Sequence, residues 1–594
     1  MTTVTSHDVV IVGAGVAGSI VAKHLTRAGL NVLLLEAGPA NAATLEGYNE
    51  HLQTFYGATA KGPESAWPAS KYAPQADTAD LRDNNGYFVQ KGPNLYGSSY
   101  SRLQGGSTLH WLGVCLRMLP EDFELQSRFG LARNWPLSYT DLEPYYCKAE
   151  YEIGVSADVK DQHYHGLSFS AGYDYPMQRV PLSYADNKLS EWVSGFRTTL
   201  GNSDYEPKIR SYPAARNSIP RGSYVPQGAI DLRMKGQPAA PYMGQRCQGN
   251  TSCTPICPAH AKYNANKTLA QADTARLQIL AQAVASRIEI DPATGMVDSI
   301  TYKRYVGDHI ETCQAKGRAY VLAAHAVENA RLMLASGLAG RNDTVGATLM
   351  DHPALYAWGL APEPVYPFRG PQSTSGVEEF RAGAFRSQHA AFRFDVGNDG
   401  WRAATGAPDS AVVDAVTNQK LFGRKLKEQL APSLLRQVRF SLAVEKLPDP
   451  ANRVTVDPQY LDPLGNPRPV VHYKISEYTL AGMAAARDVS RKLFQHAGIT
   501  DCSDSPGASW FPSVQYGNEV FHYHGMGHFA GTHAMGASAS NSVVDSYQRS
   551  WDHRNLFVTG SGSFPTMGTS NPTLTLAALT IRTAEHLIND LKAN

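Results

Sequence analysis

Histidines are concentrated near the C-terminus of this chain, in the segment HYHGMGHFAGTHAMG. His522, His524, His528 and His533 lie within twelve residues of one another. A neutral imidazole can bind a metal ion or accept a proton near neutral pH. The glycines of this segment would interrupt any helix that could align the four rings, and no carboxylate or cysteine joins them. The pattern therefore favours proton transfer over a metal site.

Three of the seven cysteines are clustered in the segment RCQGNTSCTPICPAHAK. Cys247, Cys253 and Cys257 are separated by five and three residues, and prolines stiffen the loop between them. Three thiolates suit an iron-sulfur cluster of three irons that lacks one corner. Zinc would need a fourth ligand, which His260 could supply, and the thiols could also be inert. The spacing alone leaves these three interpretations open.

The start of the chain has the pattern of a dinucleotide-binding turn. A short apolar strand, three glycines, a helical stretch and a second apolar strand follow one another in residues 8–38. Gly13 permits the turn, Gly15 lets the backbone approach a pyrophosphate, and Gly18 lets the helix pack on the strand. Glu36 ends the second strand, where a carboxylate hydrogen-bonds a ribose hydroxyl and disfavours a 2'-phosphate. This stretch predicts a bound dinucleotide without distinguishing NAD from FAD.

The composition is that of a globular protein with more than one core. The chain has 594 residues, of which 43% are hydrophobic and 18% charged, and this length predicts two closely packed domains. A net charge of +1 gives no basis for nucleic acid or an anionic membrane as partner. No apolar run reaches the ~18 residues that cross a bilayer. The first strand begins at Val9, so we expect no signal peptide on this chain.

Hydrophobic periodicity and capping residues predict the elements that must position these groups. Residues 39–80 show little periodicity and are expected to form an excursion over the cofactor. Strands are expected at 9–12, 32–35, 281–290, 319–323, 453–457 and 470–475, and helices at 139–152, 326–336 and 477–496.

Four segments together resemble the glucose-methanol-choline (GMC) oxidoreductase family, which is built on FAD. They are the N-terminal turn, the loop Gly105-Gly106-Ser107, the stretch VLAAHAVENARLMLASG and the C-terminal stretch SGSFPTMGTSNPTLT. The resemblance covers essentially the whole chain. It implies an α/β fold in which a Rossmann-like FAD-binding domain is combined with a discontinuous α+β substrate domain.

The resemblance also divides the chain between these two domains. The FAD-binding domain is expected at 1–45, 80–125, 225–350 and 530–594. The substrate domain, with its lid elements, is expected at 46–79, 126–224 and 351–529.

The family pattern assigns the two catalytic positions to residues of the C-terminal segments. Its motif of a histidine, two residues and Gly-Thr matches His528, and its second catalytic position matches Asn571. His528 is then expected to accept the hydroxyl proton of an alcohol while a hydride passes to the flavin. Asn571 cannot titrate, and its amide is expected to orient the substrate oxygen. His533, which also lies beside the Gly-Thr pair, is the nearest alternative base.

Cofactor contacts are implied at residues along the whole chain. Val284 matches a position whose backbone faces the adenine, and the helix that begins after Pro572 is expected to face the flavin pyrimidine edge. For His110 two interpretations are open, a covalent bond to the flavin 8α-methyl carbon or simple packing on the ring. The expected FAD-binding residues are Gly13, Gly15, Gly18, Glu36, Gly105, Gly106, Ser107, His110, Val284, Ser561, Gly562 and Thr573.

The cysteine loop at 246–262 resembles that of the large subunits of bacterial membrane-bound sugar and sugar-acid dehydrogenases. In those proteins a similar loop carries a 3Fe-4S cluster, which here would be held by Cys247, Cys253 and Cys257. The resemblance implies two partners, a small chaperone-like subunit with the export signal and a membrane-bound multihaem cytochrome c. It further implies a peripheral position on the periplasmic face of the bacterial inner membrane.

Within that group the C-terminal segment favours gluconate over fructose or glucose as substrate. A different function of the same fold is a soluble, cytoplasmic, oxygen-using sugar oxidase of the pyranose type, in which the cysteines would be structural. A third is a lyase that uses FAD only as a scaffold. A pure binding protein is the least favoured, because of the His528 and Asn571 pairing.

Overall fold

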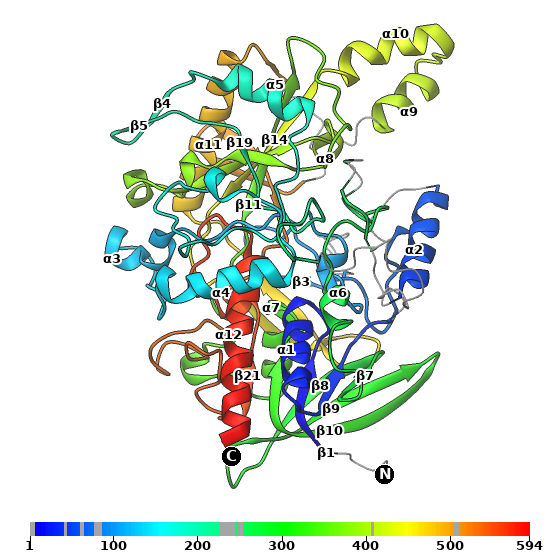
Figure 1. The fold of residues 1–594 in the computed structure, drawn as a ribbon, viewed down its shortest axis with the longest axis vertical. Helices are drawn as coiled ribbons and strands as arrows, with labels where there is room; N and C mark the ends of the chain where they lie inside the picture. The colour runs from blue at the N-terminus through cyan, green and yellow to red at the C-terminus, as the bar shows by residue number, and fades with distance from the viewer. Residues whose placement is uncertain are drawn as a thin grey trace.

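The computed structural model describes residues 6–40, 44–59, 65–76, 86–225, 244–247, 249, 253–405, 409–503 and 511–593. Within these residues the chain forms two seven-stranded sheets, with helices packed against both. The first sheet lies in the lower part of the molecule in Figure 1 and the second in the upper part. Residues 226–243, which are predicted to belong to the FAD-binding domain, lie outside the described residues.

The first sheet carries the N-terminal glycine turn. Its strands run in the order β7, β2, β1, β10, β9 and β8, and β21 pairs with β10. They are β1 (Ser6–Val12), β2 (Val32–Leu35), β7 (Leu277–Leu280), β8 (Ala283–Ile290), β9 (Val297–Val306), β10 (His309–Leu322) and β21 (Leu556–Val558). Since β1 lies parallel to both β2 and β10, the carboxyl ends of all three strands meet where the turn begins.

Strand β10 changes partner along its length. Residues 309–315 pair antiparallel with β9, and residues 316–322 pair in parallel with β1. Only its last four residues, 319–322, are continuously apolar and buried, which is why the sequence predicted a strand at 319–323 alone. The predicted buried strand is therefore confirmed as the end of a longer one.

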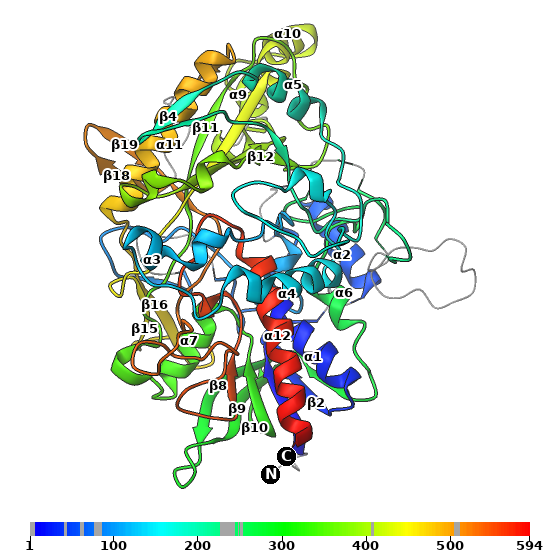
Figure 2. The ribbon, with the colours of Figure 1, turned by 60° about the vertical axis from the view of Figure 1, so that its left-hand side comes forward.

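Five helices pack around the first sheet. They are α1 (Val16–Arg27), α4 (Tyr139–Glu152), α6 (Ala265–Leu269), α7 (Ala326–Ala335) and α12 (Pro572–Ala593). α12 lies against both α1 and α4, as Figure 2 shows. The bounds of α4 are those predicted, because Ser138 and Asp141 form a reciprocal cap at its start.

The second sheet is antiparallel. Its strands run in the order β17, β11, β14, β13, β12 and β6, and β20 pairs with β11. They are β6 (Arg210–Ser211), β11 (Pro353–Leu360), β12 (Ser375–Val377), β13 (Phe392–Gly397), β14 (Gln437–Val444), β17 (Thr500–Asp501) and β20 (His524–Gly525). Helix α11 (Glu477–His496), which has the predicted bounds, packs across β11, β13 and β14.

The remaining elements are shorter or peripheral. The helices are α2 (Leu45–Gly57), α3 (Leu125–Phe129), α5 (Tyr184–Val193), α8 (Arg402–Thr405), α9 (Asp409–Thr417) and α10 (Gly423–Leu434). The strands are β3 (Val89–Gln90), β4 (Thr198–Leu200), β5 (Ser203–Tyr205), β15 (Arg453–Leu461), β16 (Pro467–His472), β18 (Ser513–Tyr516) and β19 (Glu519–His522). Helix α2 lies in the stretch where the sequence showed little periodicity, and its first turn is capped by Thr44.

The two predicted domains are interleaved. Strand β3, from residues predicted for the FAD-binding domain, pairs in parallel with β16, from residues predicted for the substrate domain. The domain boundaries themselves remain a prediction.

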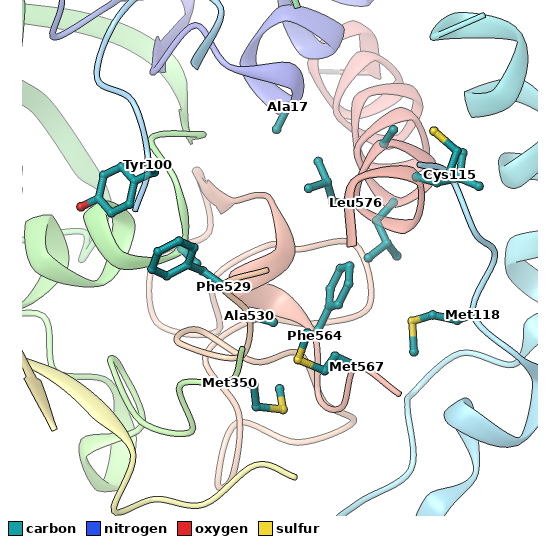
Figure 3. Packing of buried hydrophobic residues seen from close by; sticks show 14 of the residues in the cluster. Ala17, Tyr100, Cys115, Met118, Met350, Phe529, Ala530, Phe564, Met567 and Leu576 are labelled. Carbon is teal, nitrogen blue, oxygen red and sulfur yellow. The ribbon is translucent and has the colours of Figure 1, made fainter. Parts of the chain in front are cut away.

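A continuous apolar core fixes the histidine-rich segment in place. Phe529 and Ala530 are buried, and the Phe529 ring packs edge-on against Tyr100. Figure 3 shows these side chains in the same interior as Ala17 of α1 and Leu576 of α12. The backbone that carries His528 is therefore anchored by packing on one side of it.

No helix in the described part of the chain is both long enough and apolar enough to cross a membrane.

The turn between β1 and α1 leads to a testable difference between two of its glycines. A Cβ atom at Gly18 would lie 1.9 Å from the Gly13 carbonyl oxygen, whereas a Cβ at Gly15 would meet nothing within 4 Å. We expect Gly18→Ala to destabilise the cofactor-free protein by about 1–3 kcal/mol, because the turn must shift. Gly15→Ala should leave that stability unchanged. Thermal unfolding of the two apoproteins checks this, and equal melting temperatures would contradict the turn geometry.

Candidate active site

A large cavity of about 1040 Å³ lies at the carboxyl ends of the first sheet and extends toward the second. Its walls bring together residues from both ends of the chain and from several loops between them. Eleven of the predicted catalytic and cofactor positions line it: Gly13, Gly15, Glu36, Gly106, Ser107, His110, Val284, His528, Ser561, Asn571 and Thr573.

Three helices begin at this cavity. The residues at the N-termini of α1, α7 and α12 all line its wall, including Gly15, His325 and Thr573. A helix N-terminus combines free backbone N–H groups with the positive end of the helix dipole. The cavity is therefore suited to a ligand with several negatively charged groups, such as a dinucleotide pyrophosphate.

The glycine turn leaves room for such a ligand. Gly13 has φ +101°, and a Cβ there would lie 2.6 Å from the Ala323 carbonyl oxygen. The space above Gly15 is open, as a close backbone approach to phosphate requires.

Glu36 is buried at the end of β2. Its carboxylate accepts hydrogen bonds from the backbone N–H groups of Ala14 (2.9 Å) and Gly38 (2.8 Å). Burial raises the pKa of Glu36, while these two amides oppose that shift. Glu36 thus braces the glycine turn in addition to lining the cavity where the ribose is expected.

Three predicted cofactor residues do not line the cavity. Gly18 packs α1 against the turn, as its close approach to Gly13 shows. Gly105 has φ +102° and shapes the loop before Gly106, and a Cβ at Gly562 would lie 2.0 Å from the His533 ring. These glycines act on backbone packing around the cavity.

His528 and Asn571 meet at the cavity wall. The His528 Nε2 atom lies 3.1 Å from Asn571 Nδ2. On its other side, Asn571 Oδ1 accepts a hydrogen bond from Arg393 Nη2 (3.0 Å). Because a guanidinium group can only donate, this bond fixes the orientation of the amide and points its NH₂ group at His528.

A second histidine fixes the tautomer of His528. His352 Nε2 lies 2.9 Å from the Gly568 carbonyl oxygen, which can only accept, so His352 carries its proton on Nε2. Its Nδ1 atom is then the acceptor for the Nδ1–H of His528, 2.8 Å away. His528 consequently keeps an unprotonated Nε2 that faces the cavity and Asn571.

Burial keeps both rings neutral. It is the main reason that the pKa of His528 lies well below its usual value, and electrostatic interactions with His352 and Arg393 add to that effect. Burial also lowers the pKa of His352 to about 3. Asp351 accepts from the His528 backbone N–H at 3.0 Å, and burial raises its pKa to about 6. The arrangement presents a neutral imidazole lone pair to the cavity over the physiological pH range.

The other histidines of the segment do not share this position. His533 is fully buried behind the cavity wall and packs against Gly562. His524 stacks on Tyr356, with ring centroids 4.4 Å apart, and His522 is exposed on β19. Among the candidates, only His528 has a ring that lines the cavity.

His110 lines the same cavity, in the loop after Ser107. Its Nδ1 atom lies 3.4 Å from Ser101 Oγ. Burial, with the nearby charge of Lys262, lowers the pKa of His110 to about 4. A neutral ring on the cavity wall is compatible with either of its predicted interactions with the flavin.

The three clustered cysteines line one small cavity, together with Arg216 and Lys262. All three thiols are free. His260 is the candidate fourth zinc ligand. Its ring instead packs at a tilt against the Tyr48 ring, with centroids 3.8 Å apart, and its Nε2 atom lies 3.3 Å from Asn49 Oδ1. Over the described ranges, no three His, Cys, Asp or Glu side chains are arranged to hold a metal ion.

The cysteine loop also forms part of the large cavity. Thr254 and Pro255, between Cys253 and Cys257, line its wall. The Lys262 Nζ atom donates to the Trp111 carbonyl (2.6 Å) and to the Cys253 carbonyl. The cysteine loop therefore contributes residues to both the large cavity and the small one.

Sequence reasoning missed three residues of this site. His352 and Asp351 belong to the segment MDHP at the start of β11, and Arg393 is the second residue of β13. The charged pair within an apolar strand, Arg393 and Asp395, was the available signal for a polar site.

Models of known protein families match most of these regions. The GMC oxidoreductase models match residues 216–354 and 448–580, and a model described as FAD dependent oxidoreductase matches residues 8–96. The first segment contains His352 and the second contains His528 and Asn571.

Curated relatives cover nearly the whole chain. The fructose dehydrogenase large subunit of Gluconobacter japonicus is 32% identical over 99% of this chain and 98% of its own. Paromamine 6'-oxidase of Streptomyces fradiae is 26% identical over 98% and 92%. The gluconate 2-dehydrogenase flavoprotein of Pantoea cypripedii is 23% identical over 97% and 93%.

Solved structures share the fold. Pyridoxine 4-oxidase from Mesorbium loti superposes with a TM-score of 0.59, at 16% identity, over 98% of this chain and 99% of its own. A formate oxidase from Aspergillus oryzae gives 0.61 at 14% identity over the full length of both chains. Full-length identity of 32% to a curated relative, together with the family models on both halves of the site, shows that this chain is an FAD-binding member of the GMC oxidoreductase family, whose members act on CH–OH groups.

Proposed function

We propose that this protein is the FAD-binding subunit of a dehydrogenase that oxidises an alcohol group of a sugar or sugar acid. The observation that carries the proposal is the pairing of His528 and Asn571 on the wall of the FAD cavity. It places an unprotonated imidazole nitrogen beside an amide donor. The first group can accept the hydroxyl proton of an alcohol, and the second can donate a hydrogen bond to its oxygen.

The residues of the site support the following reaction. A substrate hydroxyl that accepts from Asn571 Nδ2 can donate to His528 Nε2, so both groups are satisfied by one oxygen. His528 takes the hydroxyl proton as the C–H bond breaks. FAD, when bound, accepts the hydride from the same carbon, and the alcohol becomes a carbonyl group. The His352 Nδ1 atom keeps its hydrogen bond from His528 throughout and holds the ring in place.

The relatives bear on the choice of substrate. The C-terminal segment by itself favours gluconate, whereas similarity to a fructose dehydrogenase large subunit is higher, at 32% identity, than to a gluconate dehydrogenase flavoprotein, at 23%. Two of the carboxylates that line the cavity, Asp395 and Asp399, are each paired with an arginine. The cavity therefore offers mixed hydrogen-bonding groups of both signs, which suit a polyhydroxy compound. We propose fructose as the first substrate to test and gluconate as the second.

We further propose that electrons leave through a 3Fe-4S cluster held by Cys247, Cys253 and Cys257. Support comes from the three free thiols, which line one small cavity. Other residues of the same loop line the FAD cavity. Iron-sulfur clusters are bound by cysteine thiolates, and three of them serve a cluster with three irons. Each catalytic cycle yields two electrons. The proposed cluster, as a one-electron centre, would pass them one at a time to an external acceptor.

The partners follow from this route. We propose a small chaperone-like subunit that provides the export signal, and a membrane-bound multihaem cytochrome c as electron acceptor on the periplasmic face of the inner membrane. The relative named a large subunit supports an assembly of more than one chain. A covalent bond between His110 and the flavin is proposed as well, supported by the position of the ring on the cavity wall.

A second function, oxidation with oxygen as acceptor, is favoured by the similarity to paromamine 6'-oxidase and by the oxidase structures of the same fold. It predicts hydrogen peroxide as a product and no need for the cysteines.

Anaerobic addition of fructose, gluconate or glucose to the purified holoprotein tests the substrate class. Without oxygen or an added acceptor the reduced flavin accumulates, so its absorbance band should bleach. We expect the bleaching to be fastest with fructose. In air, turnover should be far slower than with an added one-electron acceptor. A flavin that stays oxidised with all three compounds would reject the substrate class, and rapid peroxide formation would support the oxidase.

Replacement of the proposed base, His528→Ala, should slow flavin reduction by about 100-fold or more, because no other neutral imidazole lines the cavity at that point. Stopped-flow absorbance of the flavin measures the rate. His522→Ala, at an exposed position of β19, is the matched control and should keep the normal rate.

The pH profile of the same rate distinguishes a buried base from an exposed one. A pKa far below 6.5 keeps His528 neutral as the pH falls, so the rate should stay level from about pH 8 to about pH 6. A decline with a midpoint near the ordinary histidine pKa would mean that the base is solvated.

Replacement of one proposed cluster ligand, Cys253→Ser, should remove iron and the cluster spin signal and block transfer to an external acceptor. Flavin reduction by substrate should remain intact, because the two sites are separate. Cys313→Ser, outside the loop, is the control. Loss of flavin reduction in Cys253→Ser alone would contradict the division of tasks.

A further inference from the structure

We propose that Arg216, Lys262 and Lys267 form a cation cage that compensates the negative charge of the thiolate-bound cluster and raises its reduction potential. The inference rests on the proposed function, because it takes the three loop cysteines to be the cluster ligands. It concerns residues that no sequence motif singled out.

The three cations are buried without a counter-charge. Their exposed fractions are 1% for Arg216, 3% for Lys262 and 2% for Lys267. No carboxylate of the described residues lies within ion-pair distance of any of them. Residues 246–267 contain no aspartate or glutamate at all, so the undescribed positions of the loop add none. An uncompensated buried charge is costly, and three in one place are more so.

Most buried arginines elsewhere in the described chain form a salt bridge with a carboxylate, whereas the buried Arg102 and Lys446 do not. The salt bridges are Arg117–Glu150, Arg331–Glu328, Arg381–Glu378, Arg386–Glu445, Arg393–Asp395 and Arg439–Asp399. Against this background, a group of three buried cations without a carboxylate indicates a different source of negative charge.

The cysteine thiols are the groups that can supply it. Arg216 and Lys262 line the small cavity together with all three thiols. Lys267 donates to the His260 carbonyl (2.7 Å), within the loop. Neutral thiols would leave the cage uncompensated. Thiolates, which are the form that binds iron, provide the missing negative charge.

The hydrogen bonds of the cage satisfy the N–H groups of its side chains, but they do not neutralise the positive charge. Arg216 donates to the carbonyl oxygens of Leu112 (2.5 Å) and Ser373 (2.8 Å), and Lys262 donates to those of Trp111 (2.6 Å) and Cys253. Trp111 and Leu112 directly follow His110 on the wall of the FAD cavity. The cage therefore also joins the flavin-facing wall to the cysteine loop.

A charge effect on electron transfer follows. A cluster becomes more negative when it accepts an electron, so fixed positive charges in a poorly hydrated site stabilise its reduced form. Loss of one cation should lower the reduction potential and weaken the drive for electrons to leave the flavin.

The test is a redox titration of the cluster, followed by electron spin resonance, in full-length holoprotein variants. Lys262→Gln and Lys267→Gln remove one charge each but keep an N–H donor, and Lys262→Arg keeps the charge. Lys148→Gln, at an exposed position of α4, is the control for a charge change far from the loop. Iron, acid-labile sulfide and FAD contents are measured for every preparation.

We expect both glutamine variants to retain FAD and to shift the reduction equilibrium of the cluster about tenfold toward the oxidised form. For a one-electron couple this is about 59 mV. Lys262→Arg and Lys148→Gln should keep the original potential. Loss of iron from Lys262→Gln with retention in Lys262→Arg would support the cage equally, because charge would then be needed to hold the cluster.

Two results would overturn the inference. The first is an unchanged reduction potential in both glutamine variants with iron intact. The second is a change in potential or in iron content that Lys262→Arg shares with Lys262→Gln, because the shape of the side chain and not its charge would then matter. A native protein that contains neither iron nor acid-labile sulfide would instead remove the cluster from the proposed function.

Discussion

The site depends on one chain of hydrogen bonds, which runs from the Gly568 carbonyl through His352, His528 and Asn571 to Arg393. Each end of the chain has a fixed direction, because a carbonyl only accepts and a guanidinium only donates. The two constraints together leave one arrangement for the protons between them. The lone pair of His528 Nε2 thereby faces Asn571 Nδ2 and the cavity before any substrate arrives, so an alcohol need only replace the hydrogen bond between these two side chains.

This chain of hydrogen bonds also connects elements of the two sheets that are far apart in the sequence. His352 precedes β11, Arg393 lies in β13, and Asn571 immediately precedes α12. The first two belong to the second sheet or its entrance, whereas α12 packs beside α1 on the first. The base is therefore held at the junction of the two sheets, and its geometry depends on how they pack together.

Charge is handled in two ways in this protein. Around the base, buried arginines are paired with carboxylates, and burial keeps the imidazoles uncharged. Around the cysteine loop, cations are buried with only carbonyl oxygens as partners. The first environment suits the acceptance of a proton by a neutral base, and the second suits an anionic group. Residues 110–112 connect the two, because they line the large cavity and two of their carbonyl groups accept hydrogen bonds from Arg216 and Lys262.

The sequence by itself determined the elements whose signals are local. The glycine turn, β1, β2, α4 and α11 follow from periodicity, glycine spacing and capping residues within a few positions. Family motifs likewise singled out His528 and Asn571, which the structure brings within 3.1 Å. What only the tertiary structure decided was which neighbours complete these groups. His352, Arg393 and Arg216 are each separated from a hydrogen-bond partner by more than 100 residues, and these contacts arise when distant strands and loops are buried together. Local sequence does not specify such contacts, because the cost of burying a charge or fixing a tautomer appears only once water is excluded by packing.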